Sequence, residues 1–190
     1  MGGYAVKGRV SRLPRAVEGS FGIRRATRAD LPLILGFIRD LAEFEGLLHE
    51  VVATEALLDE WLFTREKAEV LIGESEGQPV GFLLYFHNFS TFLGRGGIYL
   101  EDLYIKPRAR GRGYGTRMLE ALAAIALERG CGRLEWSCLD WNSRALDFYR
   151  ALGALPMSDW TVWRLTGDTL RALAAGNPTV ADSPPATRQE

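Results

Sequence analysis

The stretch YLEDLYIKPRARGRGYGT, residues 99–116, decides the fold of this chain. It opens with the residue alternation of a β-strand, which Lys106-Pro107 ends because proline cannot donate a backbone hydrogen bond. A glycine-rich turn over residues 110–116 follows, and an apolar-periodic helix begins directly after it. We therefore expect a strand, a turn and a helix in succession. The free N–H groups at the helix N-terminus would then form a phosphate site.

Two carboxylates, Glu101 and Asp102, lie in the predicted strand. A carboxylate so close to a phosphate site predicts a transferase that uses a phosphorylated cofactor. A primary amine is mostly protonated at neutral pH, so a transfer to it requires a proton acceptor. We predict Glu101 as this acceptor, because partial burial in the strand would raise its pKa; a structural carboxylate is the alternative. Asp102 would point to the opposite face, where a structural role is favoured.

The composition excludes several classes of protein. With 190 residues, 47% of them hydrophobic, we expect one globular domain with its own core. A net charge of −1 gives no basic field for nucleic acid or for an anionic membrane. No apolar run could span a bilayer and no signal peptide opens the chain, so a cytoplasmic location is expected. Two cysteines and two histidines favour reduced thiols and no metal site.

Periodicity places further elements around the motif. Strands are expected at residues 21–25, 69–75, 79–88, 99–105, 134–138 and 160–165. Helices should follow Thr27, Thr54, the glycine turn, Asn142 and Asp168. Together these elements predict an α/β fold with a twisted, mixed, mostly antiparallel sheet of six or seven strands and helices on both faces. Residues 1–20 would be a flexible N-terminal extension, 21–175 a single domain, and 176–190 a disordered tail.

The segment between the first two helices carries an uneven charge. It contains seven acids and no Lys or Arg: Asp40, Glu43, Glu45, Glu50, Glu55, Asp59 and Glu60. A solvated helix surface is the simpler interpretation. The alternative is a negative wall that attracts a cationic substrate.

The glycine turn has three possible interpretations. A Walker P-loop is excluded, because no Gly-Lys-Ser/Thr follows. A dinucleotide-binding G-x-G-x-x-G would need glycine at Thr116, although Glu135 lies at a suitable distance for a ribose-binding acid. The third pattern, R-x-x-G-x-G, matches Arg110 to Gly115 directly after an antiparallel strand.

This third pattern and the order of elements over about residues 21–166 resemble the GNAT superfamily of acetyl-CoA-dependent N-acetyltransferases. LAEFE (41–45), IYLEDLYI (98–105), RGRGYGT (110–116) and WNSRALDFYRALGA (141–154) resemble one branch of it, spermidine/spermine N-acetyltransferase and its thialysine-acetylating relatives. The resemblance implies direct acetyl transfer from acetyl-CoA to a primary amine of a small cation, without a metal. It also implies a homodimer to which the strand near Trp163 contributes.

The resemblance further implies roles for individual residues. The backbone holding pantetheine and the acetyl carbonyl would be Leu103, Tyr104 and Ile105. The pyrophosphate would be held by Arg110, Gly111, Arg112, Gly113, Tyr114, Gly115 and Thr116. The far side of the coenzyme would meet Asn142, Ser143, Arg144 and Ala145. The amine pocket would be lined by Phe44, Glu45 and Glu101. Tyr149 would protonate the departing thiolate, although the residue alone fits a tyrosine at the core edge equally well.

Some features fit this branch less directly. A substrate-binding acid of the family falls here on Thr161, with Asp159 nearby. Cys138 could form an acyl-enzyme, but its alternation with Leu134 and Trp136 favours a buried core position. A peptide or protein N-terminal acetyltransferase and a non-catalytic acetyl-CoA sensor stay as alternative functions.

Overall fold

The structure is a computed structural model that describes residues 21–177. The predicted extension at residues 1–20 lies outside the described residues, as does most of the predicted tail. The chain forms two compact units, one ending at Leu139 and the other beginning at Asp140. A single domain over residues 21–175 stays a prediction.

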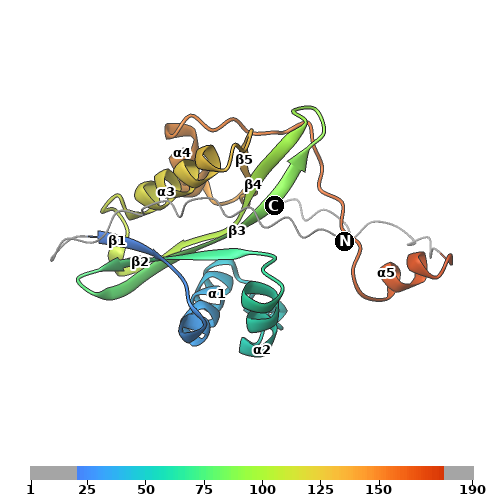
Figure 1. Cartoon of the computed structure of the whole chain (residues 1–190), viewed down its shortest axis with the longest axis horizontal. Helices are drawn as coiled ribbons and strands as arrows, with labels where there is room; N and C mark the ends of the chain where they lie inside the picture. The colour runs from blue at the N-terminus through green and yellow to red at the C-terminus, as the bar shows by residue number, and fades with distance from the viewer. Residues whose placement is uncertain (1–20, 178–190) are drawn as a thin grey trace. The chain divides into compact units, whose positions relative to one another are not determined.

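A five-stranded sheet forms the centre of the first unit (Figure 1). Its strands are β1 (Phe21–Arg25), β2 (Glu69–Ser75), β3 (Gln78–Ser90), β4 (Arg95–Ile105) and β5 (Leu134–Trp136). The first four pair in chain order as antiparallel neighbours, and β5 joins the edge parallel to β4. The predicted mixed, mostly antiparallel sheet is therefore confirmed, with five strands in place of six or seven.

Helices cover both faces of this sheet, as predicted (Figure 1). On one face lie α1 (Leu31–Glu45) and α2 (Glu55–Leu58), which continues as a π-helix over Asp59–Thr64. The other face carries α3 (Tyr114–Glu128). A 3-10 turn at Arg28–Asp30 leads into α1, and Thr27 and Asp30 form the capping box that the sequence predicts.

The core has two layers. Under α1, the buried side chains come from α1, from the π-helix and from the facing strands: Ile34, Phe37, Leu62, Val70, Ile72, Phe82, Leu84 and Tyr104. Under α3, the helix contributes Met118, Leu122 and Ile125, each no more than 1% exposed. The apolar faces of both helices therefore pack against the sheet.

The second unit contains α4 (Ser143–Ala151) and α5 (Gly167–Ala174). The strand predicted at residues 160–165 is wrong, since this segment has no regular structure and Trp163 is 91% exposed. Alternation alone does not make a strand, because its backbone groups also need a neighbouring strand to pair with. Thr166, not Asp168, is the N-cap of α5.

Candidate active site

A β-bulge in β4 sets the direction of the two predicted carboxylates. Leu84 of β3 pairs with Asp102, but the next residue, Tyr85, pairs with Leu100, so Glu101 is an extra residue of β4. A bulge reverses the alternation of the strand that contains it. Opposite residues share a face, so Asp102 lies on the face of Leu84, beneath α1.

The environments of the two carboxylates are the reverse of the prediction. Glu101 is exposed, whereas Asp102 is partly buried. Burial raises the pKa of Asp102 to about 7, and the negative charges of Glu101 and Glu45 add to this effect. Burial also raises the pKa of Glu45, at the end of α1. The expected burial of Glu101 is therefore wrong, and its neighbour has the environment expected of a proton acceptor.

An open cavity of about 530 Å³ lies between α1 and the loop after β4. Its lining has an acidic side on α1, a basic side on the loop, and two aromatic rings: Asp40, Glu43, Phe44, Tyr104, Lys106, Pro107, Arg108 and Arg110. The Arg110 guanidinium lies 4.9 Å from the centre of the Phe44 ring and 5.6 Å from that of Tyr104. Its Nε donates to the carbonyl of Ile105 at 2.8 Å. In this structure Arg110 thus forms a wall of the cavity.

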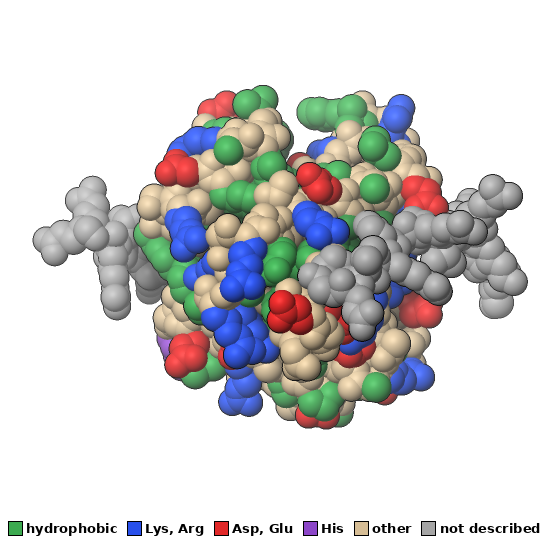
Figure 2. Space-filling model, turned by 90° about the vertical axis from the view of Figure 1, so that its left-hand side faces the viewer, with side chains coloured by type: hydrophobic (Ala, Val, Ile, Leu, Met, Phe, Trp, Pro, Cys, Tyr) green, Lys and Arg blue, Asp and Glu red, His purple; other side chains and the backbone are tan. Residues whose placement is uncertain are grey.

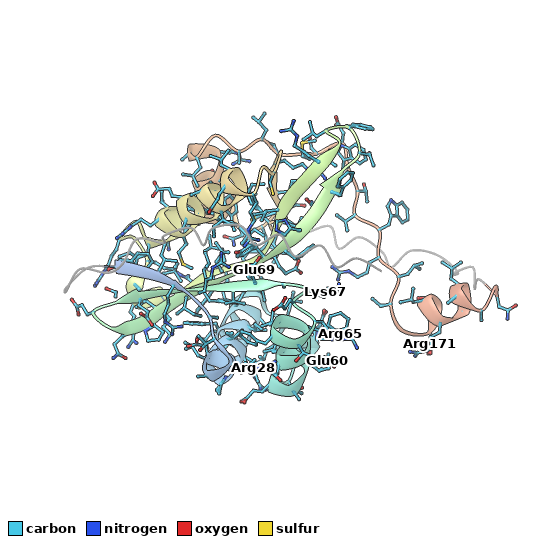
Figure 3. The ribbon with its side chains drawn as sticks, in the orientation of Figure 1. Arg28, Glu60, Arg65, Lys67, Glu69 and Arg171 are labelled. Carbon is cyan, nitrogen blue, oxygen red and sulfur yellow. The ribbon has the colours of Figure 1, made fainter. Side chains whose placement is uncertain are left out.

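Five of the seven acids of residues 40–60 fall into two groups. Asp59 pairs with Arg28 and Glu60 pairs with Arg65, in both cases at 2.7 Å, around α2 (Figure 3). In contrast, Asp40, Glu43 and Glu45 form no ion pair with any other described residue. The solvated-surface interpretation fits the first group. The negative-wall interpretation fits the second group, which lies next to the cavity and Asp102.

The glycine turn before α3 has the geometry of an anion cradle. Gly111 and Gly113 have φ of 77° and 76°, a conformation that L-residues rarely adopt, and Gly113 is the N-cap of α3. A Cβ at either glycine would meet no atom within 4 Å, so the space beside both glycines is open. Lys and Arg side chains gather on the face of the molecule that carries this turn (Figure 2). The residues therefore fit a phosphate group.

One edge of β4 is open beside this cradle. The partner strand β5 is three residues long and pairs only with Ile98–Leu100. In the part of the chain that the structure describes, no strand lies beside residues 101–105 on that edge. The backbone of Leu103–Ile105, which we expected to hold pantetheine, therefore has room for an extended ligand.

The remaining predicted residues are placed as follows. Tyr114, expected at the phosphate, turns its side chain to Phe21 and Ser75. In the second unit, Asn142 caps α4, its Oδ1 accepting from the N–H of Ala145 at 3.2 Å. The other α4 positions are Ser143 and Arg144, both exposed, and Tyr149, which is half-buried 5.3 Å from the Phe148 ring. The roles predicted for all of these residues stay predictions.

Thr161, Asp159 and Cys138 also have defined places in the structure. Thr161 and Asp159 lie in the irregular segment before α5. Cys138 lies beyond the end of β5 and is half-buried, so the alternation that placed it in the core stops at Trp136. Within residues 21–177, no group of three or more His, Cys, Asp or Glu side chains could hold a metal ion. None of the described helices is long and apolar enough to cross a membrane.

Comparison with known proteins gives a consistent result. Residues 37–154 match the model of the acetyltransferase (GNAT) family. The chain is 40% identical over 164 residues to a thialysine N-epsilon-acetyltransferase of Bos taurus, covering 80% of this chain and 96% of that protein. It is 32% identical over 153 residues to the spermidine/spermine N(1)-acetyltransferase-like protein 1 of Homo sapiens, covering 76% of this chain and 22% of that protein.

A solved structure has the same fold. An integron cassette protein from the mobile metagenome of V. cholerae superposes with a TM-score of 0.69 at 26% sequence identity. The match covers 82% of this chain and 98% of that one.

Proposed function

The chain belongs to the acetyltransferase (GNAT) family, and on that premise we propose that it transfers an acetyl group from acetyl-CoA to a small amine. The acceptor is the primary amine of a cation such as a diamine, a polyamine or a thialysine-like amino acid. Membership of the family makes the chain an acyltransferase. The donor, the acceptor and the residue roles below are our proposal.

One observation carries this proposal: a partly buried carboxylate, Asp102, lies near two other acids without an ion pair to any described cation. A folded protein normally pairs or exposes such a group, because an unpaired buried charge is costly. A cationic amine would supply the missing partner. The acids Glu45 and Glu101, with the aromatic ring of Phe44 on the cavity wall, would attract and orient that amine.

The reaction can be assigned to side chains as follows. Glu101, exposed at the bulge, binds the ammonium group, and Asp102 takes its proton, because a pKa of about 7 suits an acceptor at neutral pH. The neutral nitrogen attacks the acetyl carbonyl carbon, and the N–H groups of β4 near Leu103 stabilise the oxyanion. As the carbon–sulfur bond breaks, Tyr149 protonates the leaving thiolate, and the nitrogen loses its second proton, which returns to Tyr149 through solvent.

Acetyl-CoA would occupy the cradle and the open edge of β4. Its pyrophosphate would meet the N–H groups of residues 111–116, and its pantetheine would run beside Leu103–Ile105. The positions of the pyrophosphate and the pantetheine are supported by the two positive φ angles in the turn and by the short β5 strand. Asn142–Ala145 of α4 are the further coenzyme contacts that the resemblance to the family implies.

We also propose that the active form is a cytoplasmic homodimer. In a segment without regular structure, Trp160, Val162 and Trp163 are 71%, 78% and 91% exposed. Apolar side chains of this size normally pack against a partner, here a second copy of the chain. The chain has only two cysteines, too few for a disulfide framework, which fits a reducing compartment. Light scattering of the purified protein would test the dimer.

A thiol-release assay across acceptors tests the proposed function. Acetyl-CoA should support CoA release with diamines, polyamines or thialysine at a kcat/KM at least about tenfold above that for peptides. A preference for peptide N-termini would instead assign the enzyme to the protein-modifying class. No CoA release with any amine, combined with tight acetyl-CoA binding, would indicate a sensor.

A further inference from the structure

The side chain of Tyr114, the first residue of α3, connects the cradle to the far edge of the sheet. Its ring stacks on Phe21 of β1, with centroids 4.2 Å apart and planes 7° from parallel. Its hydroxyl lies 2.9 Å from the Oγ of Ser75, the last residue of β2. Both ends of this side chain are therefore attached to strands that take no part in the predicted coenzyme contacts.

The Phe21 ring is itself held in a fixed place. It is 4% exposed and lies over Gly73 of β2, where an added Cβ would come within 2.8 Å of the ring and 3.1 Å of the Met118 sulfur. The Arg117 guanidinium lies 5.1 Å from the ring centre. Because Gly73 leaves this space, the ring provides a rigid surface on which Tyr114 stacks.

The Tyr114 hydroxyl also senses a residue of the cradle. The hydroxyl of Ser75 and the guanidinium of Arg112 both lower the pKa of Tyr114. Arg112 is the residue between the two glycines of positive φ. The Tyr114 side chain therefore attaches the end of the turn to β1 and β2, and the charge of Arg112 acts on its hydroxyl.

We propose that Tyr114 is a positioning residue that holds the cradle in the shape required for the pyrophosphate of acetyl-CoA. Gly111 and Gly113 give the backbone of the turn many alternative conformations. Contacts with residues outside the turn are therefore needed to hold its N–H groups in one orientation. The Phe21 ring, Ser75 and Tyr114 supply that support. Coenzyme affinity improves because the turn is ordered before binding. This inference rests on the proposed use of acetyl-CoA.

The variants Tyr114→Phe and Ser75→Ala test the role of the hydroxyl. Both keep the ring stack, so both should fold. We expect calorimetry to show CoA binding about fivefold weaker in each, the effect of losing one positioning hydrogen bond. The double variant should be no weaker than either single variant, because both changes break the same connection.

A donor without a pyrophosphate separates positioning from general structural damage. For both variants, kcat/KM with acetyl-CoA should fall about fivefold, whereas kcat/KM with S-acetylpantetheine should stay at the wild-type value. Tyr99→Phe is a matched control, because it also removes a tyrosine hydroxyl that lies beside a serine. The Tyr99 hydroxyl lies 2.6 Å from Ser137 Oγ, and neither residue belongs to the cradle. This control should bind CoA as the wild type does.

Three outcomes would contradict these ideas in distinguishable ways. Wild-type CoA affinity in Tyr114→Phe and Ser75→Ala would overturn the positioning role. Equal losses with acetyl-CoA and S-acetylpantetheine would also overturn it, because the defect would then be a general one. A wild-type protein that does not bind CoA at all would overturn the proposed function on which the inference rests.

Discussion

Two carboxylates in the same sheet, Glu69 and Asp102, have opposite electrostatic environments. Burial alone would raise the pKa of Glu69, but hydrogen bonds and charge from Arg129, with bonds from Arg25 and Tyr85, lower it to about 2. Burial raises the pKa of Asp102 to about 7, and no cation offsets that rise. The same kind of group, in strands of one sheet, therefore differs by about five pKa units.

The pKa values of Glu69 and Asp102 differ because the two faces of the sheet surround these carboxylates with different side chains. Glu69, shown on the sheet in Figure 3, lies opposite Tyr85, whose hydroxyl donates to it at 3.0 Å. Arg129 follows α3 and donates to the same carboxylate at 2.8 Å. Asp102 lies on the opposite face, beneath α1, among other acids. A fully paired carboxylate stabilises the fold, whereas an unpaired one indicates a place for a ligand.

The largest expected effect comes from Asp102→Asn. Loss of the proton acceptor should lower kcat/KM by about 10²-fold. The melting temperature should stay unchanged or rise, because no buried carboxylate is left to desolvate. Steady-state kinetics and thermal unfolding on the same preparation would measure both. A variant with near-wild-type turnover would remove Asp102 from the mechanism.

The complementary change, Glu69→Gln, should affect stability and leave the chemistry alone. Removing this carboxylate leaves Arg25 and Arg129 without their shared partner. We expect a loss of about 2 kcal/mol in the free energy of unfolding. This is below the value for a fully buried pair, because the Glu69 side chain is 33% exposed. The matched control is Glu60→Gln, whose surface pair with Arg65 should contribute less than about 0.5 kcal/mol.

Urea unfolding measures these free energies, and kcat should be unchanged in both variants. A large loss of kcat in Glu69→Gln would mean that the Glu69 cluster supports the active site as well as the fold. An equal loss of stability in the two variants would contradict the distinction between a paired interior carboxylate and a surface one.

The two carboxylates should also give stability a pH dependence of opposite sign. The folded pKa of Asp102 is raised from 3.8, so its contribution is complete below about pH 4 and is lost as pH rises through about 7. The folded pKa of Glu69 is lowered from 4.5, so its contribution is present above about pH 4.5 and is lost as pH falls through about 2. Each slope should approach about 1.4 kcal/mol per pH unit.

Variants assign each slope to its residue. In Asp102→Asn, the fall in stability between about pH 4 and pH 7 should disappear, and in Glu69→Gln the loss at acid pH should shrink. Unfolding curves across this range would show both effects. If the same slope persisted in Asp102→Asn, a group other than Asp102 would be titrating there.

The sequence predicted those features that depend on local chemistry. The cradle was recognisable because the spacing of Gly111 and Gly113 directly sets the conformation of the turn. The capping box of Thr27 and Asp30 and the N-cap at Asn142 also involve residues close along the chain. The strand predicted at 160–165 failed, because a strand needs a partner whose presence its own alternation does not encode.

The features that sequence analysis missed depend on contacts between distant segments. The bulge at Glu101 is a property of the register between β3 and β4, so regular alternation did not predict that Asp102 is more buried than Glu101. Nothing in residues 99–105 signals this extra residue. Glu69 was not singled out, because Arg25 and Arg129, the cations that lower its pKa, come from segments far from it in the chain.

The smallest expected effect comes from Glu45→Gln, which changes the surroundings of Asp102 without removing its carboxylate. The charge of Glu45 contributes to the raised pKa of Asp102, so its removal should lower that pKa. The acid limb of the kcat/KM profile should then move to lower pH. If Glu45 also binds the second charge of the acceptor, KM for a diamine should rise about fivefold, with a monoamine little affected.

The matched control for this variant is Glu55→Gln, an exposed acid at the start of α2. It removes the same charge from the same acidic segment, away from Asp102. A rise in KM shared by both variants would show that the acceptor responds to the overall charge of the segment. A rise confined to Glu45→Gln, together with the displaced acid limb, would tie acceptor recognition to an acid that acts on Asp102. Glu69 and Asp102 would then differ in function. Glu69 pairs with cations of the protein, whereas the cationic partner of Asp102 would be the substrate.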